Sequence, residues 1–247
     1  MRFATALSCA LAVLLVQFAP ARAMDVQRPV VLRSDRGIVN YQPAGTTTQL
    51  VVDGSLVFDE KAYASTQADS IGVLEFPDTS QLTLAPNSAI QVYDFLPRKQ
   101  HVFRKRYAYF WDGSTIRLPS TSTTLRLDVR QPDGGDSDYV VLTRFARIDV
   151  HGTSALLSDS TGGDIVTCLD CGAGDIVANI AGEDYVVGNG ETLVVTQQGR
   201  ISLVATTGIV MQGFASSGLS TDRLPQPEPQ KRFRFQWTPP FAKHPSS

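Results

Sequence analysis

The sequence has few of the side chains that carry out most enzymatic reactions. It contains only three histidines, His101, His151 and His244. A hydrolase triad needs a nucleophile, a base and an orienting group in contact. These histidines belong to three unrelated segments: a basic and aromatic stretch, a Gly-Thr turn and the C-terminal tail. We therefore predict that the chain is not an enzyme, with no catalytic residue, bound metal or cofactor.

Long hydrophobic runs are missing beyond the first 23 residues. Those residues begin with Arg2, continue with an apolar run over 4–19 and end in "ARA", which is the pattern of a secretory signal peptide cleaved after Ala23. The run is slightly shorter than a membrane span of about 20 residues, and an uncleaved N-terminal anchor is the alternative. We predict a periplasmic or secreted chain with no integral membrane span after cleavage.

An excess of positive charge is missing too. The formal net charge is −2, and it becomes −4 without Arg2 and Arg22 of the signal peptide. The composition therefore does not indicate nucleic acid as a partner. The remaining chain of about 220 residues is long enough for one domain with its own core and no disulfide scaffold.

Cysteine is scarce, which limits its roles. Of the three cysteines, Cys9 lies in the signal peptide, and Cys168 and Cys171 remain between the strand-like runs "GDIVT" and "GDIVANI". A structural zinc site needs four ligands, and a thioredoxin-type pair needs its first thiol at a helix N-terminus. In an oxidising compartment such a pair tends to oxidise. We favour a local disulfide at a hairpin turn, with two free thiols, a redox pair or a metal knuckle as the alternatives.

Helical periodicity is absent from the remaining chain as well. Over residues 30–211, short apolar or alternating runs are broken by Gly, Asp, Asn, Pro or Ser about every 8–12 residues. In "TLRLDV", Leu125 and Leu127 alternate with polar residues, as in a strand with one buried face. The last of these runs is "GIVMQGF" at 208–214. The pattern predicts an all-β fold, either an antiparallel β-sandwich or a short β-solenoid of many short strands, with little helix.

A strand–turn–strand signature stands in the first half of the chain. In "VLEFPDTSQLTLAPNSAIQV", apolar and polar residues alternate on both sides of Asp78, and Asn87 marks the following turn. With the glycine-led strand before it, this stretch over residues 37–95 resembles the FecR family of envelope proteins. The family usually has Gly after the Asp, where this chain has Thr79. The resemblance implies a predominantly β domain over residues 24–223.

Three later motifs, in the family's order, extend the resemblance over residues 36–204. They are Gly152-Thr153, the "DCG" of the cysteine motif, and Gly190-Glu191. The best-known FecR proteins are membrane-spanning regulators whose cytoplasmic part controls a sigma factor, but only three residues precede the apolar run here. The resemblance thus implies an exported, non-enzymatic sensory or protein-interaction module of the bacterial cell envelope. A polysaccharide-binding or surface-binding structural protein is the alternative, and a thiol redox protein is the third interpretation.

An atypical insertion in this pattern is expected at 97–135, and its first part interleaves basic and aromatic residues. One interpretation is an edge hairpin whose charges face water and discourage strand addition. The other is a contact surface for an envelope protein, or for an anionic or glycan ligand, because clustered arginines with aromatics suit such recognition. The candidate partner-binding residues are Arg98, Lys99, Arg104, Lys105, Arg106 and Trp111.

The tail over 224–247 is rich in proline and has no apolar period. We expect it to be extended or disordered. Within it, "KRFRFQW" at 231–237 alternates charged and aromatic residues, so an added strand on an exposed sheet edge is the alternative. The loop with Asp133 and Asp136 lacks the ligand spacing of a calcium site, and we interpret it as a solvated turn.

Overall fold

The computed structural model describes residues 29–101, 107–119, 122–130, 138–172 and 175–222. Four features predicted from the sequence lie outside the described residues: the signal peptide over 1–23, the tail over 224–247, the loop with Asp133 and Asp136, and the basic residues Arg104, Lys105 and Arg106.

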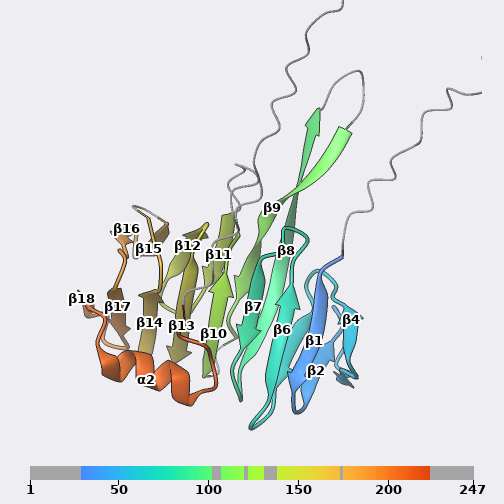
Figure 1. Cartoon of the computed structure of the whole chain (residues 1–247), viewed down its shortest axis with the longest axis horizontal. Helices are drawn as coiled ribbons and strands as arrows, with labels where there is room; N and C mark the ends of the chain where they lie inside the picture. Colours follow the sequence, from blue (N-terminus) through green and yellow to red (C-terminus); the bar gives the residue numbers. More distant parts are fainter. Residues whose placement is uncertain (1–28, 102–106, 120–121, 131–137, 173–174, 223–247) are drawn as a thin grey trace, which may run out of the picture.

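Within the described ranges, the chain forms two nine-stranded sheets that face each other across one hydrophobic core (Figure 1). In spatial order, the first sheet consists of β18 (Ile201–Ala205), β17 (Glu191–Thr196), β14 (Gly163–Cys168), β13 (Ser154–Ser160), β10 (Thr123–Asp128), β7 (Gln81–Leu84), β6 (Ile71–Glu75), β1 (Val31–Arg36) and β4 (Ser55–Val57). The second consists of β16 (Glu183–Val186), β15 (Ile176–Ile180), β12 (Arg147–His151), β11 (Asp138–Leu142), β9 (Tyr107–Arg117), β8 (Ala89–His101), β5 (Tyr63–Thr66), β2 (Val39–Gln42) and β3 (Leu50–Val51). The predicted all-β fold is confirmed, and of the two predicted architectures the sandwich is observed.

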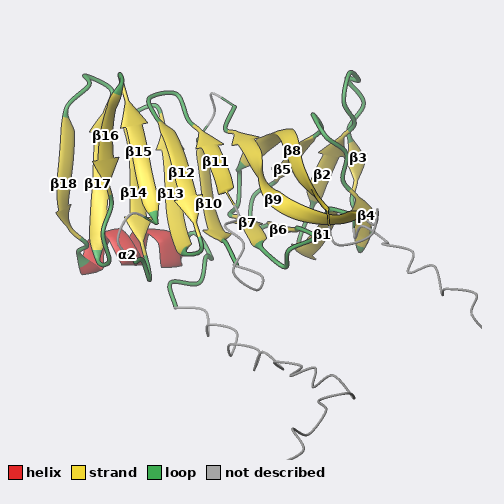
Figure 2. Cartoon of the chain, turned by 90° about the horizontal axis from the view of Figure 1, so that it is seen from above, coloured by secondary structure: helices red, strands yellow, loops and turns green. Residues whose placement is uncertain are grey.

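After each of the hairpins from β6 onward the chain crosses to the other sheet. β6 and β7 pair in the first sheet and β8 and β9 in the second, and the single strand β10 then joins the first sheet. The hairpins β11–β12, β13–β14, β15–β16 and β17–β18 follow, in the second and first sheets by turns. Each hairpin pairs with the preceding strands of its own sheet, so the two rows of strands extend in the same direction (Figure 2). The pairings between described strands are antiparallel, except that β9 and β11 run parallel.

The core lies between the inner faces of the sheets, as the sequence alternation predicts. Leu125 and Leu127 of β10 are fully buried there. The polar residues between and after them are also buried, although they lie on the outer face: Arg126 is 3% exposed and Asp128 is 5% exposed, and they form a salt bridge at 2.9 Å. The Arg126 guanidinium also donates to the carbonyl of Ser220 at 2.6 Å. The segment after the helix therefore covers this part of the outer face.

One segment predicted as a strand is a helix. The run "GIVMQGF" belongs to α2 (Gly208–Ser216), which lies along the first sheet (Figure 1). The side chain of Thr207 accepts a hydrogen bond from the N–H of Val210 and so caps the first turn. Phe214 packs in a second apolar cluster with Leu156 of β13, and this burial stabilises the helix despite its short length. In the described part of the chain, no helix is long and apolar enough to cross a membrane.

A two-stranded extension of β8 and β9 projects from the sandwich (Figure 1). We call residues 97–112 the arm, and 102–106 within it lie outside the description. β5 pairs with β8 only as far as Gln91, and β11 pairs with β9 only from Gly113 onward. The described strands of the arm thus pair with each other alone. The later part of the stretch predicted as an insertion, in contrast, supplies the end of β9 and all of β10, which are built into the two sheets.

Candidate functional site

Most of the motif turns lie along one edge of the sandwich, meaning one of the two sides at which the strands end and the turns lie. We call this edge the motif rim. The strand register places the β6–β7 turn, the end of β10 and the β12–β13 turn at the same edge, because Gln81 pairs with Asp128 and Asp128 with Ser154. The end of β14 and the β16–β17 turn follow at that edge, since β14 pairs with β13 and β17 in the same way. The exception is Asn87, which lies in the β7–β8 turn at the opposite edge with φ of 55°.

The β6–β7 turn is organised around a buried carboxylate. Asp78 accepts hydrogen bonds from the backbone N–H and the hydroxyl of Ser80, each at 2.9 Å, and from the hydroxyl of Tyr139, 2.9 Å from both carboxylate oxygens. The Ser80 hydroxyl oxygen also accepts from the N–H of Arg130 at 2.9 Å. Thr79 has φ of 68°, so it takes the left-handed backbone that Gly adopts most easily. The tight turn therefore forms although the usual Gly is replaced.

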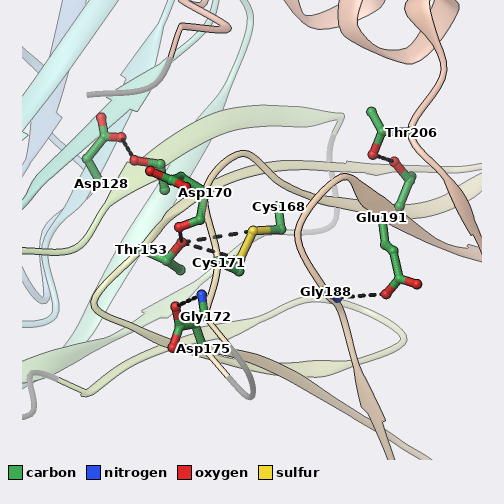
Figure 3. Close-up of a disulfide and its surroundings, with 12 residues drawn as sticks. Asp128, Thr153, Cys168, Asp170, Cys171, Gly172, Asp175, Gly188, Glu191 and Thr206 are labelled. Carbon is green, nitrogen blue, oxygen red and sulfur yellow. Dashed lines mark hydrogen bonds between the residues drawn. A yellow bond between two sulfur atoms is a disulfide. The ribbon is translucent and has the colours of Figure 1, made fainter. Parts of the chain in front are cut away.

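The Gly-Thr turn and the cysteine motif meet at the motif rim (Figure 3). Cys168 and Cys171 form a disulfide, which confirms the favoured prediction, and their Cα atoms are 6.0 Å apart. The hydroxyl of Thr153 donates to the carbonyl of Asp170 at 2.6 Å and lies 3.3 Å from the sulfur of Cys171. Gly152, with φ of 55°, reverses the chain just before it. The two motifs are thus one packed unit.

The disulfide is not at a hairpin turn, contrary to our prediction. β14 belongs to the first sheet and β15 to the second, and they do not pair. The N–H of Leu169 donates to the carbonyl of Ser154 at 2.9 Å, and the N–H of Gly172 donates to the carboxylate of Asp175. The prediction assumed that strands adjacent in sequence pair, whereas this chain crosses between sheets after each hairpin. The disulfide fastens the start of such a crossing.

The Gly190-Glu191 motif forms the neighbouring turn. Glu191 accepts the N–H of Gly188 in its carboxylate at 2.8 Å, and Gly190 has φ of 73° (Figure 3). Behind this turn, the hydroxyl of Thr192 lies 2.9 Å from that of Thr206. These contacts are internal to the turn, so the motif shapes the rim.

The arm leaves the sandwich from the motif rim. Gly113 at its foot pairs with Asp138 of β11, and Asp138 pairs with His151, directly before Gly152. The His151 ring nitrogen Nδ1 lies 2.7 Å from the Asp138 carboxylate, and both side chains are partly exposed. A hydrogen-bonded pair of polar side chains thus lies at the surface between the arm and the Gly-Thr turn.

A second pair of ionisable groups lies at the foot of the arm. The Glu60 carboxylate accepts the N–H of Phe95 in β8 at 3.0 Å, and this hydrogen bond lowers the pKa of Glu60. Burial, followed by the neighbouring Glu60, raises the pKa of Asp94. The hydroxyl of Ser114 in β9 donates to the carbonyl of Asp94 at 2.8 Å. These bonds hold β8 and β9 where the sheet neighbours end.

The structure describes only some of the candidate partner-binding residues. The backbones of Arg98, Lys99 and Trp111 lie in the arm, where Arg98 pairs with Phe110 and Lys99 with Tyr109. Arg104, Lys105 and Arg106 belong to 102–106, outside the described residues. The structure therefore places the described candidates on the arm, next to the motif rim.

Comparison with known proteins finds solved structures that resemble part of this fold. No protein-family model matches the chain, and no curated protein matches its sequence. Two crystal structures of candidate anti-sigma factors from Parabacteroides distasonis ATCC 8503 are similar in fold. The first is 13% identical with a TM-score of 0.46 and covers 62% of this chain and 63% of that one. The second is 15% identical with a TM-score of 0.42 and covers 58% and 59%. The match spans less than two thirds of each of these chains.

Sequence reasoning missed several groups at this rim. Tyr139 stands in the apolar run "YVVL", and nothing in the pattern indicates that its hydroxyl meets Asp78. His151 was expected at a turn or strand end, and its pairing with Asp138 depends on the register of β11 and β12. Charged and hydrogen-bonding groups thus surround the foot of a projecting hairpin, an arrangement that suits recognition of another molecule.

Proposed function

We propose that this protein is a non-enzymatic interaction module of the bacterial cell envelope, and that the arm and the adjoining motif rim contact its partner. The FecR-like order of motifs and the signal-peptide pattern of residues 1–23 support the compartment and the class of module. The arm is the observation that carries the proposal.

A two-stranded ribbon is marginally stable in water by itself. Beyond Gln91 and Gly113 the described strands of the arm have no third strand beside them. Segments of low local stability are those from which binding elements are drawn. The arm gains stability when a partner covers it, so binding and ordering support each other.

The sequence of the arm points to the chemistry of the partner. Five basic residues and five aromatic residues occur between positions 98 and 111. Arginine recognises carboxylate and phosphate groups and stacks on flat surfaces, and aromatic residues are enriched in the centre of protein interfaces. An acidic envelope protein fits this composition. An anionic glycan is the second candidate, favoured by the same basic residues.

The experiment is site-specific cross-linking in intact cells with a tagged full-length chain. A photo-reactive amino acid replaces Lys99 in the arm, and a matched copy carries it at Glu183, an exposed residue of β16. We expect one envelope protein to cross-link at Lys99 and not at Glu183. Equal products at both positions would contradict the assignment to the arm, and a glycan adduct at Lys99 would favour the second candidate.

Two arm variants separate binding from folding. In one, Asn-Gly replaces residues 97–112 and joins the paired residues Leu96 and Gly113 by a two-residue turn. In the other, Arg98→Glu and Lys99→Glu reverse two charges, with Arg200→Glu in an exposed turn as the control. We expect both arm variants to lose the partner while the control retains it. Mass spectrometry of the N-terminus tests the compartment: a start at Met24 supports export, and an intact Met1 contradicts cleavage.

A further inference from the structure

Two buried carboxylates face each other at the edge opposite the motif rim. Asp159 of β13 and Asp164 of β14 are direct partners in the antiparallel register, and each is 1% exposed. Side chains alternate between the faces of a strand, and Leu157 and Val166, two residues away on the respective strands, belong to the central core. Both carboxylates therefore point between the two sheets.

Few hydrogen-bond donors offset the cost of burying these two carboxylates. The hydroxyl of Thr143, in the turn between β11 and β12, donates to Oδ2 of Asp164. Oδ1 of Asp164 and both oxygens of Asp159 are buried without a hydrogen-bond partner. A buried polar atom without a partner costs roughly 1–3 kcal/mol, and more when it is charged. It is unfavourable for both carboxyls to be ionised here, because each charge is removed from water and the two charges repel each other.

Among the described residues, the charge of Arg144 acts on both carboxylates. Across the first sheet, Asp159 faces Thr123 of β10, and Asp164 faces Val195 of β17, neither of which is charged. From the second sheet, the β11–β12 turn presents Thr143, Arg144 and Phe145: the hydroxyl of Thr143 and the backbone N–H of Phe145 favour the charged form of Asp164, and the Arg144 charge acts on both carboxyls. Two carboxylates and one guanidinium leave one negative charge, which one proton neutralises.

A metal ion fits this place less well than a proton. Calcium takes six to eight oxygen ligands. The two carboxylates have four oxygens, and one of them, on Asp164, already accepts the hydroxyl of Thr143. A divalent ion would also leave an excess positive charge beside Arg144.

We propose that Asp159 and Asp164 bind one proton between them, and that release of this proton weakens the junction between the β13–β14 hairpin and the β11–β12 turn. With the proton on Asp159, its carboxyl donates to Asp164, and Asp164 remains the acceptor for Thr143. Without it, two negative charges face each other across the register pair. The edge of the sandwich then loosens where Thr143 joins the second sheet to the first.

The direction of the pH dependence follows from the same contacts. Burial, followed by the charge of Asp164, raises the pKa of Asp159 to about 7, and burial also raises the pKa of Asp164. The ordinary pKa of Asp159 is 3.8. Because the folded-state pKa is raised, the stabilisation from this proton is fully present below pH 3.8 and is lost as the pH rises from there through about 7.

The test is urea unfolding of the purified full chain between pH 5 and 8.5. One additional proton in the folded state changes the unfolding equilibrium constant about tenfold per pH unit. We expect the native protein to lose stability at close to this rate between pH 5 and 6 and more slowly through pH 7, and Asp159→Asn to remove that dependence. Asp149→Asn, which removes a surface partner of Arg147, is the matched control and should retain it.

A native protein whose stability does not fall with rising pH would overturn the proposal, as would an Asp159→Asn variant that falls like the native protein. Calcium that restores stability at pH 8, with reversal by a chelator, would also overturn it in favour of a metal site. If Asp159→Asn does not fold, carbon-13 carboxyl spectra of the native protein decide: an Asp signal titrating near pH 7 supports the proposal, and its absence contradicts it. Faster amide exchange of residues 143–146 at pH 8 than at pH 6, after correction for intrinsic rates, tests the loosening; unchanged protection contradicts it.

Discussion

The hydroxyl of Tyr139 lies 2.9 Å from both carboxylate oxygens of Asp78 and so joins the second sheet to the β6–β7 turn of the first. The ring of Tyr139 also packs edge-on against Phe76, with centroids 5.0 Å apart. Tyr139 is fully buried. One side chain thus contributes both to the core and to the motif rim.

Tyr139→Phe should destabilise the protein by about 2 kcal/mol, because it removes a hydrogen bond to a buried carboxylate while keeping the ring. Urea unfolding measures the change. Tyr63→Phe, at a residue 37% exposed, is the control and should stay within about 0.5 kcal/mol. Equal effects of the two substitutions would show that the Asp78 contact adds no stability.

Removing the disulfide should loosen one crossing without unfolding the domain. The loop that Cys168 and Cys171 close is very short, and chain-entropy arguments give about 2 kcal/mol for such a loop. Cys168→Ala with Cys171→Ala should therefore lower the free energy of unfolding by about this amount, measured against the oxidised native protein. The reduced native protein is the matched control. Complete loss of folded protein would contradict a local role.

Gly113→Ala should be among the most damaging substitutions at the foot of the arm. A Cβ there would lie 1.7 Å from the carbonyl oxygen of Asp138, and the backbone φ is 136°. We expect a loss of about 3 kcal/mol, typical of a strongly strained backbone, together with loss of partner binding. Gly213→Ala is the control: a Cβ meets nothing within 4 Å in α2, and it should stabilise the helix by about 1 kcal/mol. Thermal unfolding that ranks the variants in the opposite order would refute the assignment.

The helix depends on a single buried aromatic side chain. Phe214→Ala should cost about 3–5 kcal/mol and expose the segment after α2 to proteases. Ile209→Ala, at a residue 82% exposed on the same helix, should change stability by less than about 0.5 kcal/mol. Limited proteolysis followed by mass spectrometry locates the first cleavage. If cleavage after α2 is unchanged in Phe214→Ala, the helix is held by other contacts.

The fold class could be predicted from the sequence because strand alternation is a local property. "TLRLDV" carries the period of two that buries Leu125 and Leu127 in the core. The turn at Asp78 and Thr79 could be placed for the same reason, since its residues are adjacent in the chain. The helix at 208–214 could not, because its apolar run shows no clear period and its stability depends on Leu156 of another strand.

Contacts between distant segments were beyond the sequence argument. The disulfide was predicted, but its position at a crossing depends on which sheet β15 joins. Asp159 and Asp164 stand on both sides of "STGG", a spacing that suits opposite positions in a hairpin. Their burial, however, depends on Thr143 in the other sheet, and polar residues near a turn are ordinarily exposed.

The crossing of the chain to the other sheet after each hairpin has a consequence for how the molecule assembles. Among the described strand pairs, the largest sequence separation between paired residues is that between Gln81 and Asp128. No described strand therefore needs a partner from the opposite end of the chain. Folding speeds up when pairing partners are near in sequence. The sandwich can therefore form in order from its N-terminal strands, with each hairpin pairing with the earlier strands of its own sheet. If the chain emerges N-terminus first, during synthesis or export, each new hairpin finds the edge strand of its own sheet already formed and can pair with it.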